Sequence, residues 1–165
     1  VAEGIDLTLE RDTRNALIGS AQSRLSIDPR RFYLAGFSGT ARATLNFAVE
    51  LRGHVAGVFA DGAAIGFAPD GIEVTFTGDS TFAYFAATGD GDFNHEEVRA
   101  AVERLRLSKV PNRLAIFAGP HSWPPVEICG RALDGFQMRA ITAPPSTTRR
   151  MTPAPTFPAA PLPIR

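Results

Sequence analysis

The chain has 165 residues with 17 basic and 17 acidic side chains, so its formal net charge is zero. This balance gives no electrostatic reason to expect a nucleic acid or an anionic membrane as partner. No apolar run approaches the ~20 residues of a membrane-spanning helix, and a hydrophobic content of 44% is typical of a globular protein.

The hydrophobic pattern predicts helices and strands in alternation. Helical segments repeat apolar residues every three or four positions, as Val98, Ala101, Val102 and Leu105 do, whereas strand segments are short uninterrupted apolar runs. In chain order we expect a helix over 12–25, a strand over 32–35, a helix over 39–51, strands over 55–60 and 82–87, a helix over 94–107, a strand over 113–117 and a helix over 125–141. This order predicts an α/β fold with a parallel sheet of about four strands, flanked by helices.

Polar residues, proline and glycine mark several ends of these elements. Asp12 is expected to cap the first helix, and Asn94 the third, with Glu97 at its capping-box position. Asp28-Pro29 predicts a turn, and Gly53 ends the second helix.

Two segments depart from the pattern. Residues 61–81 are rich in glycine, aspartate and proline and are predicted to be mostly loop, with residues 72–76 as one candidate strand. Seven of the 13 prolines fall within residues 144–165, a composition that does not favour a packed core. We therefore expect a single domain over residues 1–142, followed by a disordered tail or linker over residues 143–165.

A serine stands where the first strand runs into a helix, in the segment Phe32-Tyr-Leu-Ala-Gly-Phe-Ser-Gly-Thr-Ala-Arg42. Small neighbours allow a tight turn that pushes the hydroxyl of Ser38 clear of the sheet. The N–H groups at the start of the helix favour negative charge at this point. This layout is typical of a nucleophile elbow.

Polar residues also follow the other three strands. Asp61 follows the second strand, Asp90 and Asp92 the third, and His121 the fourth. The carboxyl ends of parallel strands meet at one edge, so these side chains should lie near Ser38. A serine becomes a nucleophile when a histidine takes its proton, and a carboxylate orients that histidine. The order serine, aspartate, histidine is that of α/β-hydrolases.

Three motifs resemble those of this family. Residues 28–41 are similar to the nucleophile region of α/β-hydrolases of the esterase and polyester-depolymerase kind. The turn Gly89-Asp-Gly-Asp92 resembles their acid turn, and Gly119-Pro-His121-Ser-Trp-Pro-Pro resembles the histidine loop of a bacterial subset. The resemblance covers about residues 10–140. It implies Ser38 as nucleophile, Asp92 as acid and His121 as base, with the backbone N–H of Gly39 as an oxyanion donor.

The chain departs from the family pattern in two respects. Thr40 occupies the last position of Gly-x-Ser-x-Gly, where it should shift the helix slightly. Only 37 residues precede Ser38, so the chain resembles the C-terminal half of the fold. We therefore expect one oxyanion donor to be missing, and the strand over residues 32–35 to form an exposed apolar edge through which the chain can associate.

Several residues have more than one interpretation. Asp61 is the second candidate for the acid, whereas Asp90 is expected to bond backbone in its turn. Phe37 and Trp123 are candidates for the substrate pocket, although Trp123 is equally compatible with packing. Cys129 is expected in the core. His54 and His95 are expected at the surface, and no His/Cys cluster has metal-ligand spacing, so we expect no metal and no other cofactor.

The sequence therefore predicts a serine hydrolase that cleaves a small-molecule carboxylic ester through an acyl-enzyme on Ser38. A peptidase with the same three residues is one alternative, because this chemistry also cleaves amides. A truncated, non-catalytic hydrolase-like module is the other.

Overall fold

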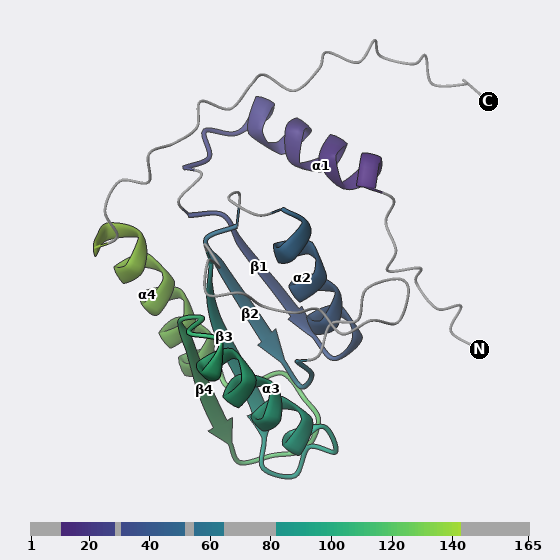
Figure 1. Ribbon diagram of the computed structural model, residues 1–165, viewed down its shortest axis with the longest axis vertical. Helices are drawn as coiled ribbons and strands as arrows, with labels where there is room; N and C mark the ends of the chain where they lie inside the picture. Colours follow the sequence, from purple (N-terminus) through teal and green to yellow (C-terminus); the bar gives the residue numbers. More distant parts are fainter. Residues whose placement is uncertain (1–10, 29–30, 52–54, 65–81, 143–165) are drawn as a thin grey trace, which may run out of the picture.

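Four parallel strands form one sheet, in the order β1-β2-β3-β4 (Figure 1). The computed structural model describes residues 11–28, 31–51, 55–64 and 82–142. The elements are α1 (Arg11–Arg24), β1 (Tyr33–Phe37), α2 (Gly39–Glu50), β2 (Gly57–Asp61), β3 (Ala83–Gly89), α3 (His95–Leu107), β4 (Asn112–Phe117) and α4 (Val126–Thr142). The predicted α/β class is thereby confirmed, with every expected helix and strand of the described ranges in its place.

The boundaries differ from the predicted ones by a few residues. The helix α1 begins at Arg11, so Asp12 lies in its first turn and does not precede it. The strand β2 extends to Asp61, which was expected to open a loop. The expectations for Pro29, Gly53, His54, residues 65–81 and the tail over residues 143–165 lie outside the described residues.

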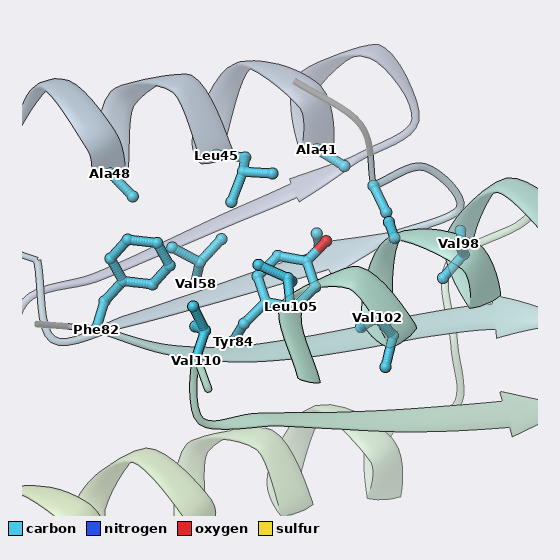
Figure 2. Packing of buried hydrophobic residues seen from close by; sticks show 14 of the residues in the cluster. Ala41, Leu45, Ala48, Val58, Phe82, Tyr84, Val98, Val102, Leu105 and Val110 are labelled. Carbon is cyan, nitrogen blue, oxygen red and sulfur yellow. The ribbon is translucent and has the colours of Figure 1, made fainter. Parts of the chain in front are cut away.

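Helices cover both faces of the sheet, whereas α1 lies beyond the amino-terminal ends of the strands (Figure 1). On one face, α2 packs on β1 and β2 while α3 packs on β3 and β4. Figure 2 shows Leu45 and Ala48 of α2 directed toward Val58 and Tyr84 of the sheet. On the other face, α4 closes a second core that contains Phe59, Phe85, Phe117, Ile128, Ala132 and Phe136.

Burial follows the position of each strand in the sheet. All five residues of β2 are buried, because the strand has neighbours on both sides and helices over both faces. Strand β1 is only partly buried, and Ala35 within it is exposed. Within the described ranges, the outer edge of β1 has no partner strand. The same ranges contain no helix long and apolar enough to cross a membrane.

Helix α3 provides a direct test of this packing. Leu105 is 2% exposed in the core, whereas Leu107 on the same helix is 69% exposed. We expect Leu105→Ala to lower the free energy of unfolding by about 2–5 kcal/mol, because it leaves a cavity between α3 and the sheet. Leu107→Ala should change it by less than about 0.5 kcal/mol. Urea denaturation measures both, and equal effects would contradict the assigned face of α3.

Candidate active site

Ser38 joins β1 to α2 in a strained backbone conformation, with φ 54° and ψ −123°. A residue with a side chain rarely adopts a positive φ, and such strain is common at functional sites. The Ser38 N–H donates a 2.8 Å hydrogen bond to the backbone oxygen of Asp61, the last residue of β2. This bond therefore fixes the turn to the neighbouring strand.

The helix that follows Ser38 lies unusually close to β1. A Cβ atom added to Gly36 would come within 2.5 Å of the backbone oxygen of Thr40, so only glycine fits there. The Thr40 hydroxyl donates to the Phe37 oxygen at 2.6 Å and accepts from the Phe37 N–H at 2.9 Å. Thr40, which departs from the family pattern, thus satisfies both backbone groups of the residue before Ser38.

Substituting Gly36 should break the elbow. We expect Gly36→Ala to destabilise the protein by at least about 1–3 kcal/mol, because the backbone of α2 must move away from β1. Gly130→Ala is the matched control: the site on α4 has open space, and alanine in a helix is favoured over glycine by about 0.5–1 kcal/mol. Thermal unfolding of the two variants should therefore shift in opposite directions.

Ser38, His121 and Asp92 form one hydrogen-bonded chain. His121 Nε2 lies 2.9 Å from Ser38 Oγ, and His121 Nδ1 lies 2.9 Å from Asp92 Oδ2. The side chain of Asp92 is 1% exposed and that of His121 is 18% exposed, so the carboxylate is shielded from solvent while the imidazole remains partly accessible. A carboxylate on Nδ1 leaves Nε2 free to accept the serine proton, which is the arrangement that activates a nucleophile.

The loop that carries Asp92 and the loop that carries His121 are bonded to each other. Asp90 accepts a 2.9 Å hydrogen bond from the Gly119 N–H, and Gly119 O accepts one from the Gly91 N–H at 3.0 Å. Asp90 thus bonds backbone as expected, although in the facing loop and not in its own turn. His95 is part-buried and lies 2.9 Å from the Gly89 oxygen, which corrects its expected surface position.

Asn94 occupies the predicted N-cap position of α3, but the capping box predicted there is wrong. The Asn94 side chain makes no cap hydrogen bond; its amide donates instead to the Gly62 oxygen at 2.7 Å. Glu97 accepts both of its short bonds from the Arg42 guanidinium, at 2.7 and 2.8 Å. Asp92 Oδ1 accepts the Asn94 N–H at 2.7 Å, so the remaining oxygen of that carboxylate is also bonded.

Asp61, the second candidate for the acid, has a different environment. It is fully buried, and neither carboxyl oxygen has a hydrogen-bond partner. Burial, with the nearby charge of Asp92, raises the pKa of Asp61 to about 7. Burial and Asp61 together raise the pKa of the Cys129 thiol on α4, which packs against the second core. His121 Nδ1 lies 2.9 Å from Asp92 Oδ2 and makes no hydrogen bond to Asp61; the role of Asp92 as the acid stays a prediction.

The raised pKa of Asp61 predicts a pH-dependent stability. In the unfolded chain this carboxyl ionises near pH 3.8, whereas in the folded protein it keeps its proton to about pH 7. Stability is therefore lost as the pH rises between these values, over about three units at about 1.4 kcal/mol each, on the order of 4 kcal/mol. Asp61→Asn, which cannot ionise, should stabilise the protein relative to wild type at pH 8 far more than at pH 4.

Denaturation of both proteins across this pH range measures the difference. Asp134→Asn, a substitution of an exposed carboxylate on α4, is the control and should show little pH dependence relative to wild type. A pH-independent difference for Asp61→Asn would contradict the buried, neutral state of this carboxyl group.

Aromatic rings surround the imidazole of His121. Phe37 lies 4.6 Å from it between ring centroids, and Trp123 lies 5.4 Å from Phe37. Phe93, which is not among the predicted site residues, lies closer to the imidazole, at 4.3 Å. In the sequence, the position of Phe93 directly after Asp92 is the feature that could have marked it as a site residue. Trp123 is 55% exposed and therefore is not a core packing residue.

The remaining expectations concern the oxyanion and metals. Within the described part of the chain, the N–H of Gly39 has no hydrogen-bond partner and is free at the start of α2. Among the same residues, no group of three or more histidine, cysteine, aspartate or glutamate side chains could hold a metal ion.

Comparison of structures identifies the fold. The chain superimposes on a Bacillus cereus carboxylesterase with a TM-score of 0.60 at 16% identity, covering 84% of this chain and 66% of that one. For the esterase LipW from Mycobacterium marinum the TM-score is 0.59 at 15% identity, covering 75% of this chain and 53% of that one. For FphF, a fluorophosphonate-binding serine hydrolase of Staphylococcus aureus, the TM-score is 0.57 at 14% identity, covering 76% of this chain and 62% of that one.

Over most of its length, then, the chain has the α/β-hydrolase fold of these esterases and serine hydrolases. It spans between about half and two thirds of the length of the structures it matches. Sequence comparison finds neither a protein-family model nor a curated protein that matches it.

Proposed function

We propose that this chain carries the catalytic residues of a serine esterase. The observation on which the proposal depends is the chain of two 2.9 Å contacts that joins Ser38 to His121 and His121 to Asp92. The fold of known esterases and the strained elbow at Ser38 support it. Together these features favour acyl transfer through a serine nucleophile.

The reaction follows from the geometry. Ser38 Oγ attacks the ester carbonyl carbon while His121 Nε2 takes its proton, and Asp92 stabilises the imidazolium. The tetrahedral intermediate collapses, the bond to the alcohol oxygen breaks, and His121 gives its proton to that oxygen. Water then repeats the sequence on the acyl-enzyme, with His121 as base, and releases the carboxylic acid.

The Gly39 N–H is our candidate for stabilising the carbonyl oxygen as it becomes negative. It is unpaired within the described residues and belongs to the first turn of α2, where the helix dipole also favours an anion. A second donor has not been identified among these residues. Removal of one such donor costs about 10²–10³ in rate, so the activity should be sensitive to any segment that supplies it.

The outer edge of β1 is where further structure could be added. This edge has no partner among the described strands. The strand β1 leads directly into the elbow at Ser38, which α2 follows. Association through it, expected from the sequence, stays a prediction.

A fluorophosphonate probe tests the proposed nucleophile. We expect the probe to label Ser38 in the protein, and Ser38→Ala to abolish both labelling and hydrolysis of 4-nitrophenyl acetate. Asp92→Asn should lower kcat on the order of 10³–10⁴-fold, because the histidine loses its orienting carboxylate. Asp61→Asn should remain within about tenfold of wild type, since it has no contact with His121 Nδ1.

Ser122→Ala is the matched control for the serine, because Ser122 is adjacent to His121 but bonds only the Pro120 oxygen within the described residues. Its labelling should be unchanged. Absence of labelling in the wild-type protein would favour the non-catalytic module. Cleavage of a 4-nitroanilide as fast as the corresponding ester would favour a peptidase.

A further inference from the structure

Each member of the proposed triad has an aromatic residue within two positions of it in the sequence. Phe37 precedes Ser38, Phe93 follows Asp92, and Trp123 is two positions after His121. These rings form an aromatic cluster in which Phe93 and Phe37 contact the imidazole, at centroid distances of 4.3 and 4.6 Å, and Trp123 contacts Phe37 at 5.4 Å.

This cluster is open to solvent on one side. Phe93 is 78% exposed and Trp123 is 55% exposed, although aromatic side chains dominate cores and interfaces. Scattered exposed apolar residues need no explanation, but the Phe93 ring is exposed directly beside the imidazole of His121, and Trp123 is exposed beside Phe37. An exposed ring beside the imidazole suits the apolar part of a bound substrate.

The reaction determines which part of the substrate this is. His121 Nε2 must pass the proton from Ser38 Oγ to the alcohol oxygen, so that oxygen comes within hydrogen-bond reach of Nε2. The carbonyl oxygen, in contrast, is directed toward the Gly39 N–H at the start of α2. The alcohol substituent therefore leaves the reaction centre beside the imidazole, where Phe93 is the exposed ring.

We propose that Phe93 binds the alcohol half of the ester and selects alcohols that carry an aromatic ring. Aromatic rings prefer stacked or edge-to-face contacts with centroids 4.5–7 Å apart, which a ring on the alcohol can make with the exposed ring of Phe93. The proposal deepens the esterase function and rests on it. Phe93 is a specificity-determining residue here, since the proton transfers do not involve it.

Two series of esters separate the two halves of the substrate. Ethyl acetate and benzyl acetate share the acyl group and differ in the alcohol. Ethyl acetate and ethyl phenylacetate share the alcohol and differ in the acyl group. Because kcat/KM reports the step in which the alcohol leaves, the ratio within each series measures recognition of one half alone.

The wild-type protein should prefer benzyl acetate to ethyl acetate. Phe93→Ala should lower this preference by about tenfold and change the acyl preference by less than about twofold. For Phe93→Leu the preference for benzyl acetate should lie between those of the wild type and Phe93→Ala, because leucine keeps an apolar surface without a ring. Leu133→Ala, which changes an exposed apolar residue on α4, is the control and should change neither ratio.

Alcoholysis provides a second measurement on the same site. When benzyl alcohol attacks the acetyl-enzyme, its proton passes to His121, the bond to Ser38 Oγ breaks, and benzyl acetate forms. Phe93→Ala should lower the yield of benzyl acetate relative to acetate by a similar factor, with ethanol as the comparison alcohol.

The outcomes are distinct. If Ser38 is labelled by the fluorophosphonate and esters are cleaved, but Phe93→Ala leaves the alcohol preference unchanged, this inference is wrong and the esterase function stands. If Phe93→Ala changes only the acyl preference, Phe93 binds the other half and the inference is again wrong. If Ser38 is unlabelled and no ester is cleaved, both proposals fail.

Discussion

The backbone of Ser38 has a positive φ that costs about 1–3 kcal/mol, and the surrounding structure must supply this free energy. The hydrogen bond from the Ser38 N–H to the Asp61 oxygen fixes the turn to β2. The Thr40 hydroxyl bonds both the N–H and the oxygen of Phe37. The missing side chain at Gly36 lets α2 lie against β1. Since these contacts come from two strands and a helix, the hydroxyl is presented only when the sheet is paired in this register.

The same register brings His121 to a serine 83 residues earlier in the chain. Parallel strands end at a common edge, so the turns after β3 and β4 meet above the end of β1. The hydrogen bond from the Gly119 N–H to Asp90 joins those two turns to each other directly. His121 and Asp92 are thus held in position relative to each other, and His121 contacts Ser38 at the elbow.

Two side chains near this unit reverse the usual distribution of polar and apolar groups. Asp61 is a carboxyl buried without partners, and Phe93 is a ring left in solvent. Each costs free energy where it stands, because burial penalises the ionised carboxylate and exposure forfeits the hydrophobic gain of the ring. Departures of this kind are expected around a functional site more than elsewhere in a fold.

The sequence by itself determined the order and type of the elements and selected Ser38, His121 and two candidate carboxylates, because periodicity and strand-end position are local properties. It could not decide between Asp92 and Asp61 on physical grounds, since each follows a strand; only the turn after β3 directs Asp92 to His121. Glu97 stands at a position that suits a local cap, yet it forms charge-assisted hydrogen bonds with Arg42, 55 residues away. Phe93 was missed because ring contacts depend on how separate loops meet, which only the tertiary structure decides.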